Sequence, residues 1–202
     1  MNRIAVVAMA GLLMACSAFR SSAQKPADET APELFRVNIE TSKGPVVVEV
    51  TRSLAPHGAD RFYTLVKNGY FDGARFFRVV PGFVVQFGMA ADPKVNKVWD
   101  TPIQDDPVKV VNERGTLVFA ATSQPNSRTT QMFINLVDNP RLDGMGFSPF
   151  AKVVSGMEAV DAINSEYREM PDQGRIGEEG NTYLEKEFPN LDFIKTAKIA
   201  GK

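Results

Sequence analysis

The sequence predicts a mainly β domain, either a closed barrel or a sandwich of short antiparallel strands, with two helices packed against it. Short apolar stretches separated by Gly and Pro recur at close spacing from residue 35 to the C-terminus, whereas only two stretches place apolar residues at helical spacing. With 44% hydrophobic and 23% charged positions, the 202-residue chain also has the composition of one globular domain with a sizeable core.

A hairpin opens the predicted domain. Apolar and polar residues alternate over 35–40, which is the period of a half-buried strand. A turn at Thr41–Gly44 follows, and the apolar run Val46–Val50 provides the returning strand.

Two helices are expected, one near each end of the domain. The first lies between Pro56, which suits a first turn, and Gly69, which can end a helix. Its apolar face consists of Ala59, Phe62, Leu65 and Val66. The second begins with a capping-box pattern at Ser155 and Glu158. Apolar residues at helical spacing follow this pattern, namely Met157, Val160 and Ile163.

Short strands account for most of the remaining chain. They are expected at Phe76–Val80, Phe83–Phe87, Thr116–Ala120, Gln131–Asn135, Phe150–Val154 and Phe193–Ile199. Two long loops are expected between them. One is Asp92–Pro107, with Trp99 as a packing anchor, and the other is the polar, Gly- and Glu-rich stretch 166–190.

The N-terminus has the pattern of an export signal. A basic start at Asn2–Arg3 precedes an apolar run, Ile4–Ala15, that is too short to span a bilayer. Two processing sites fit: a lipobox ending at Cys16, which would then carry lipid, or cleavage after Ala23, with Cys16 an incidental residue. We expect an export signal at 1–23, a linker at 24–32 and the domain at 33–202. The mature protein would be periplasmic and would reach the membrane only through a lipidated Cys16.

Charge and composition exclude several classes of function. The formal net charge is -1 and charges of both signs are mixed along the chain, so binding to nucleic acid is not expected. One Cys and one His are too few for a Cys/His zinc site, and no disulfide can form within the chain. We expect neither a metal nor a cofactor. His57, at a predicted helix start, is expected to be solvated.

Two polar side chains, Arg78 and Gln86, lie in the apolar stretch 76–88. Alternation would place Gln86 on one face with Val84 and opposite Phe83, Val85 and Phe87, unless the strand bulges. Such polar groups are costly in apolar surroundings unless they are partnered or used. Either Arg78 pairs with a carboxylate at a barrel rim and Gln86 satisfies backbone groups, or both belong to a functional site.

Three ordered segments bear on this choice. They read FFRVVPGFVVQFG at 76–88, GTLVFA at 115–120 followed by QMFIN at 131–135, and LDG at 142–144 followed by FSPFAKVV at 147–154. In order and spacing they resemble the cyclophilin family of peptidyl-prolyl cis-trans isomerases. The similarity extends from about Phe35 to the C-terminus.

The resemblance implies a closed eight-stranded antiparallel barrel capped by two α-helices, with an active groove on its outer face. By position in the motifs, Arg78 is the catalytic arginine, and Gln86 is a second catalytic position. The implied substrate-binding positions are Phe77, Phe83, Val84, Ala120, Gln131, Phe133, Arg141, Leu142 and Phe147.

The sequence departs from the family pattern at several of these positions. Phe77 and Phe147 stand where many members have His, Arg141 where Trp is common, and Val84 where Met is frequent. Without the Trp, cyclosporin binding is expected to be weak. The missing His matters less, because bond rotation needs no proton carrier.

The implied function is acceleration of X-Pro bond rotation in exported polypeptides during folding, by a monomer whose partners are Pro-containing polypeptides. A fixed guanidinium can favour a twisted amide over both planar isomers. Two alternatives stay open. One is a Pro-peptide-binding chaperone module without turnover on the same fold, and the other is a structural envelope domain, which would have no pocket where Arg78, Phe83, Gln86 and Phe133 converge.

Overall fold

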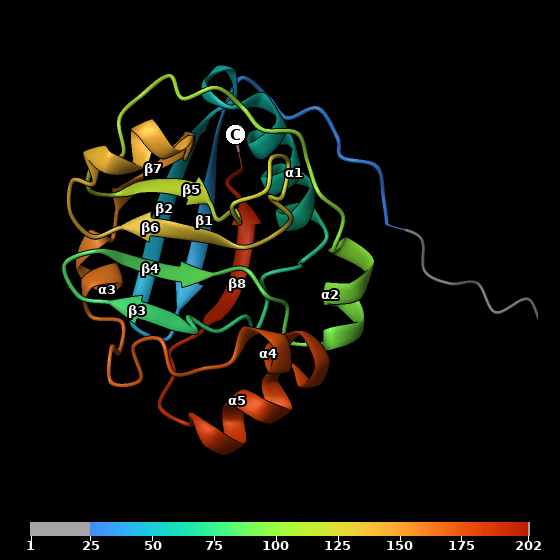
Figure 1. Cartoon of the computed structure of the whole chain (residues 1–202), viewed down its shortest axis with the longest axis vertical. Coiled ribbons are helices and arrows are strands. Elements are labelled where there is room, and N and C mark those ends of the chain that lie inside the picture. Colours follow the sequence, from blue (N-terminus) through green and yellow to red (C-terminus); the bar gives the residue numbers. More distant parts are fainter. Residues whose placement is uncertain (1–24, 202) are drawn as a thin grey trace, which may run out of the picture.

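A computed structural model describes residues 25–201, and within them eight strands form one antiparallel sheet. The order is β3-β4-β6-β5-β7-β2-β1-β8. The sheet curls so that β3 to β6 cross in front of β1, β2 and β8 (Figure 1). The strands are β1 (Leu34–Thr41), β2 (Gly44–Thr51), β3 (Arg78–Val80), β4 (Val84–Phe87), β5 (Thr116–Phe119), β6 (Met132–Asn135), β7 (Pro149–Ser155) and β8 (Ile194–Ile199).

The sheet is a curled half-barrel, and the expectation of full closure is not met. Within residues 25–201, β3 and β8 are the two edges of the sheet and do not pair with each other. An isolated bridge between Arg75 and Phe193 joins the chain just before these two strands. This single bridge does not extend into the strands, so the sheet stays open along a seam between β3 and β8.

The hairpin of β1 and β2 forms as predicted, and burial fixes its register. Phe35, Val37 and Ile39 are buried while their neighbours are exposed. Thr41 pairs with Gly44 across the turn. Gly44 has φ 130°, a conformation that favours glycine. Because a slip of one residue would turn the apolar side chains to solvent, the register is strongly specified.

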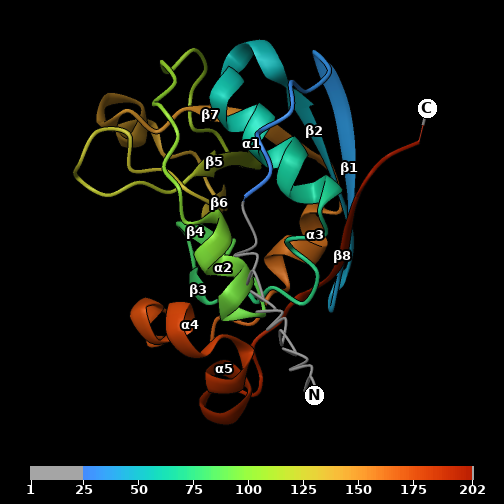
Figure 2. The ribbon, with the colours of Figure 1, turned by 90° about the vertical axis from the view of Figure 1, so that its right-hand side faces the viewer.

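Two helices pack against the two open ends of the curled sheet (Figure 1). Helix α1 (Pro56–Lys67) has Pro56 in its first turn and buries its predicted apolar face. Helix α3 (Met157–Asp161) is shorter than expected. The two helices lie at opposite ends of the curl: α1 is to the right of the strands and α3 to their left in Figure 1, and in Figure 2 α1 faces the viewer with α3 behind it. The predicted capping box is wrong: Gly156 is the N-cap of α3, with φ 84° and without a side-chain cap bond. A Cβ at Gly156 would collide with the backbone of Pro45.

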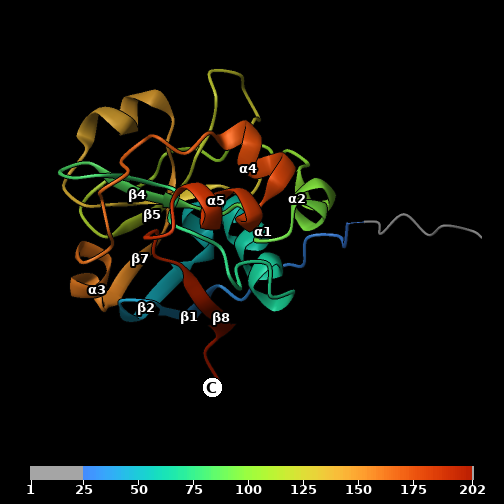
Figure 3. The same ribbon diagram turned by 90° about the horizontal axis from the view of Figure 1, so that it is seen from below.

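The two expected loops contain three helices that the sequence did not predict. Helix α2 (Pro93–Trp99) is capped by Asp92, whose side chain accepts from the backbone N–H of Lys94. Helices α4 (Gln173–Glu179) and α5 (Asn181–Glu187) lie together before β8 (Figure 3). Two short 3-10 helices, η1 (Arg52–Leu54) and η2 (Pro140–Met145), complete the elements.

The N-terminal described residues lie along α1 without forming a helix or strand. Asp28 pairs with the buried Arg61, and the backbone N–H of Ala31 donates to Asp60. The predicted export signal, its two processing sites and Cys16 fall outside the described residues. Over 25–201, no helix combines the length and the apolar character that crossing a membrane requires.

Candidate active site

A pocket of about 520 Å³ lies on the outer face of β3, β4, β6 and β5, the face turned toward the viewer in Figure 1. Ten of the eleven sequence-predicted site residues line it. They are Arg78, Phe83, Val84, Gln86, Ala120, Gln131, Phe133, Arg141, Leu142 and Phe147. The structure thus brings together residues that lie up to 69 positions apart in the chain.

Strand pairing sets the central row of the pocket. Arg78 of β3 lies opposite Gln86 of β4, Gln86 opposite Phe133 of β6, and Phe133 opposite Val118 of β5. Because alternate residues of a strand point to opposite faces, these side chains share the outer face. Their neighbours Val79, Val85, Ile134 and Leu117 belong to the main core.

The polar members of the row form a hydrogen-bonded chain. The Nη1 of Arg78 donates to the Oε1 of Gln86 over 3.1 Å, and the Nε2 of Gln86 donates to the Oε1 of Gln131 over 2.9 Å. On its other side, the Nε of Arg78 donates to Glu169 over 2.7 Å. Arg78 therefore pairs with a carboxylate, as the first interpretation expected, whereas Gln86 bonds to the side chains of Arg78 and Gln131 and not to backbone groups. Both side chains also line the pocket.

The apolar part of the pocket is a small second core. Val84, Val118, Phe133 and Leu142 are buried together, and Phe83, Ala120 and Phe147 pack against them. Phe133 and Phe147 meet edge to face, with ring centroids 5.7 Å apart. This arrangement leaves an apolar notch beside the Arg78 guanidinium.

Phe83 joins this notch because it lies in the turn before β4 and not in the strand. Its N–H donates to the Val80 carbonyl, and its own carbonyl accepts from the N–H of Leu136. Strict alternation, which would have sent Phe83 to the core with Val85 and Phe87, does not apply before Val84. Two guanidiniums lie over its ring, with the Cζ of Arg78 5.8 Å and the Cζ of Arg141 5.3 Å from the centroid.

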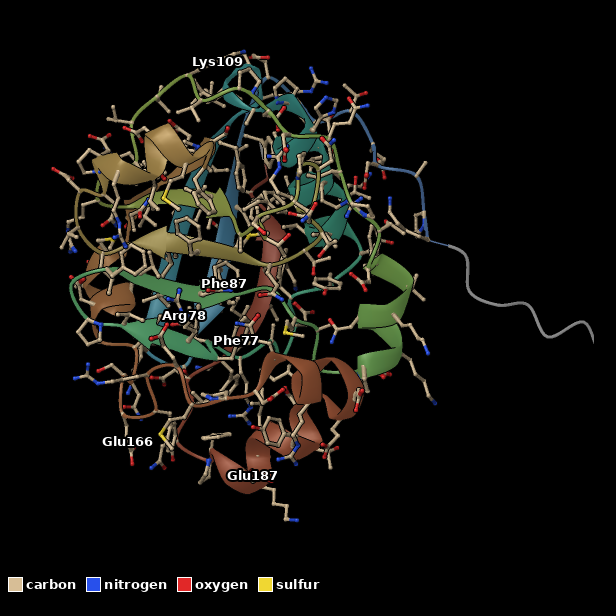
Figure 4. All side chains as sticks on the ribbon, in the orientation of Figure 1. Phe77, Arg78, Phe87, Lys109, Glu166 and Glu187 are labelled. Carbon is tan, nitrogen blue, oxygen red and sulfur yellow. The ribbon has the colours of Figure 1, made fainter. Side chains whose placement is uncertain are left out.

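Phe77 is the predicted site residue that the structure places elsewhere. Its side chain is 1% exposed and packs with Ile176, Tyr183, Leu184, Phe188 and Leu191. Figure 4 shows it near α4, on the side of β3 away from the pocket row. Its assignment as a substrate-binding residue is corrected: Phe77 anchors helices α4 and α5.

Sequence reasoning missed several residues of the pocket wall. Loops and helices outside the matched motifs supply Asp100, Ala121, Thr122, Ser127, Thr129, Met145 and Gln173. The loop at 121–129 is held by the buried Arg128, which pairs with Asp106 over 3.1 Å. The sequence offered no signal for this order, because Arg128 and Asp106 lie 22 positions apart and meet only in the folded chain.

A second cavity of about 730 Å³ extends the groove toward α2 and α4. It shares four wall residues with the first pocket, Asp100, Thr129, Gln131 and Gln173. Cavities of these sizes are typical of ligand sites.

A guanidinium beside an apolar notch, in a groove outside a curled β-sheet, fits an enzyme that rotates X-Pro bonds. Residues 36–180 match the family model described as cyclophilin type peptidyl-prolyl cis-trans isomerase/CLD. The chain belongs to the cyclophilin-type peptidyl-prolyl cis-trans isomerases.

Relatives agree with this assignment. A peptidyl-prolyl cis-trans isomerase of Acinetobacter baylyi is 33% identical over 168 residues, covering 81% of this chain and 82% of that protein. Isomerase B of Escherichia coli is 35% identical over 135 residues, covering 63% and 82%. A Cryptosporidium parvum cyclophilin-type isomerase structure has a TM-score of 0.64 at 22% identity, covering 84% and 99%, and supports the fold. The predicted family and enzyme class are confirmed.

Proposed function

We propose that this cyclophilin rotates X-Pro bonds of exported polypeptides during folding, with Arg78 as its catalytic residue. The observation that carries the proposal is the position of the Arg78 guanidinium, beside the apolar notch and bonded to Gln86. The groove is complete within one chain, so we propose that the monomer is the active form.

The reaction needs a donor at the twisted amide and little else. Rotation about an X-Pro bond meets a barrier of about 18–20 kcal/mol because the C–N bond has partial double-bond character. In the twisted state the prolyl nitrogen loses resonance and its lone pair can accept a hydrogen bond. Arg78 would donate there, or to the proline carbonyl, and would stabilise this state more than either planar isomer.

The rest of the pocket would hold the peptide while the bond turns. Phe83, Val84, Phe133, Leu142 and Phe147 form a notch for the pyrrolidine ring. Gln86, Gln131 and the backbone near Ala120 would bind polar groups of the peptide, and Arg141 would support the ring of Phe83. Each tenfold in rate requires about 1.4 kcal/mol, so a few charge-assisted hydrogen bonds can supply several decades.

The compartment is part of the proposal. The export pattern at 1–23 supports a periplasmic protein, and a chain with one Cys suits an oxidising compartment. Mass measurement of the mature N-terminus tests this point. A lipid on Cys16 would establish the lipoprotein form, and an N-terminus at Gln24 the soluble form. An intact Met1 in exported fractions would contradict both.

A protease-coupled assay with a Pro-containing peptide tests the catalytic role of Arg78. We expect the mature domain to accelerate isomerisation and Arg78→Ala to lower kcat/KM by about a hundredfold, the usual effect of losing one preorganised donor. Arg36→Ala, which removes an exposed arginine of β1 paired with Glu49, is the matched control and should retain full activity. If Arg78→Ala folds and keeps its rate, the mechanism is wrong; if the wild type binds the peptide without accelerating it, the chaperone alternative holds.

A further inference from the structure

A short segment between α3 and α4 lies along the outer edge of β3. The backbone N–H of Val79 donates to the carbonyl oxygen of Arg168 over 3.0 Å. Val79 is the middle residue of β3 and directly follows Arg78. This bond therefore fixes the segment beside the proposed catalytic arginine.

The segment has an unusual backbone at the same point. Arg168 has φ 48°, the left-handed region that residues other than glycine seldom adopt. Such strain persists where the surroundings hold it, and it tends to occur at functional sites. Here the surroundings are the Val79 bond on one side and Tyr167 on the other, whose ring lies 5.1 Å from that of Phe188.

Glu169, the next residue, contacts Arg78 directly. One carboxylate oxygen of Glu169 accepts from the Nε of Arg78 over 2.7 Å and lies 2.6 Å from its Nη2. Gln86 accepts from Nη1. A guanidinium has five N–H donors in a rigid fork. By these contacts, Glu169 takes one edge of the fork, and one further N–H on each Nη is left to meet a peptide.

We propose that Glu169 is a positioning residue for isomerisation, holding the Nε edge of Arg78 so that the Nη1–Nη2 edge meets the peptide. The inference rests on the proposed role of Arg78. A long flexible side chain that is already oriented loses less entropy when it engages the twisted amide. The side chains of Glu169 and Arg78 are 60% and 25% exposed, so the pair contributes little to stability, and its effect lies in orientation.

The position of Glu169 depends on the anchor described above. Phe77 is buried among residues of α4, α5 and the chain that follows, and Tyr167 packs on the same cluster. One extended stretch thus carries both the anchor, Phe77, and the residue that is held, Arg78. Phe77, which stands where many family members have His, thus helps to hold the segment that carries Glu169 beside the groove.

Three variants test the proposal. Glu169→Ala should lower kcat/KM by about fivefold, in kcat more than in KM, because the interaction acts on the twisted state. Glu169→Gln should recover most of this loss, because its amide oxygen can accept the same bond. The matched control is Glu166→Ala, which removes a carboxylate of the same segment that accepts from Asn164 and Asn190 (Figure 4). It should leave kcat/KM unchanged.

The NMR signal of the Arg78 Nε–H provides a readout independent of activity. We expect a sharp, slowly exchanging signal in the wild type and in Glu169→Gln, and a broadened, faster-exchanging one in Glu169→Ala with an unchanged melting temperature. Wild-type kcat/KM and an unaltered signal in Glu169→Ala would overturn the proposal, as would a rise in kcat/KM. An inactive wild type would refute the proposed function, while the NMR signal would still show whether Glu169 holds Arg78.

Discussion

At the scale of single residues, Phe83 organises the groove. Its carbonyl is fixed by the N–H of Leu136 and by the side chain of Asn139, and Arg78 and Arg141 lie over its ring. A cation over an aromatic ring contributes about 0.5–1 kcal/mol at exposed sites. Arg141 stands where a Trp is common in the family, and it still presents a planar group that supports one wall of the notch.

Tyr70 gives a pH-dependent prediction. Burial raises the pKa of Tyr70 to about 12, and its hydroxyl contacts Gly88, Asn96 and Thr130. An unfolded chain loses this proton near pH 10, so between about pH 10 and 12 the folded protein binds more protons, and its free energy of unfolding falls as pH rises. The stability of the wild type relative to Tyr70→Phe should therefore fall in this range, by at most about 1.4 kcal/mol per pH unit.

Urea unfolding of both proteins at several pH values measures this difference. The Tyr70→Phe variant serves as the internal reference, because every other titrating group is shared. Parallel stability curves above pH 10 would mean that Tyr70 ionises as readily in the folded protein as in the unfolded chain.

The sequence predicted most of the pocket at this scale, for a definable reason. Arg78, Gln86 and Phe133 lie on strands within the matched motifs, so order and spacing identified them. Phe77 was misassigned because the family role was carried over to a position where this chain has a different residue, and the Phe packs with α4 and α5 instead. Glu169 was missed because its role depends on a tertiary contact 91 residues away in the chain.

At the scale of elements, helices α4 and α5 form because of tertiary packing and not because of the helix propensity of their own residues. Each has seven residues, below the length at which an isolated helix is stable, and α4 contains Gly174 and Gly177. Their buried residues Ile176, Tyr183 and Leu184 pack on Phe77. The sequence therefore predicted a loop at residues 166–190, because the helices there depend on contact with Phe77, which lies far earlier in the chain.

Loss of that anchor should release the two helices. We expect Phe77→Ala to cost about 3 kcal/mol or more, as large-to-small changes of buried Phe do. Hydrogen exchange should accelerate more over 166–190 than over β1 and β2. Leu34→Ala, at an exposed position of β1 (59%), should change neither region. Uniform loss of protection over the sheet would contradict a separate α4–α5 unit.

At the scale of the whole molecule, the N-terminal segment is tied to the groove through one buried cation. Arg61 is 1% exposed, and its carboxylate partner is Asp28, over 2.9 Å. It also donates to the carbonyls of Thr101 and Thr129. Since Thr129 lines both cavities, the chain that follows the predicted export signal supports a wall of the groove.

Asp28→Ala tests this connection. Breaking a buried ion pair costs about 3–5 kcal/mol, and because Asp28 is itself 24% exposed we expect about 2 kcal/mol. Chemical denaturation measures the loss, with Glu40→Ala on the exposed face of β1 as the control. Equal stability of the two variants would show that water replaces Asp28 at no cost.

The seam between β3 and β8 has an architectural consequence. Strand β8 takes its register from β1 and strand β3 from β4, so the chain between α3 and β8 can gain or lose residues without changing any strand pairing. In this protein the chain between α3 and β8 forms α4 and α5, which pack on Phe77, and a segment that bonds to β3 beside the groove. A sheet that stays open between β3 and β8 can therefore acquire a different groove wall while its strands keep their positions.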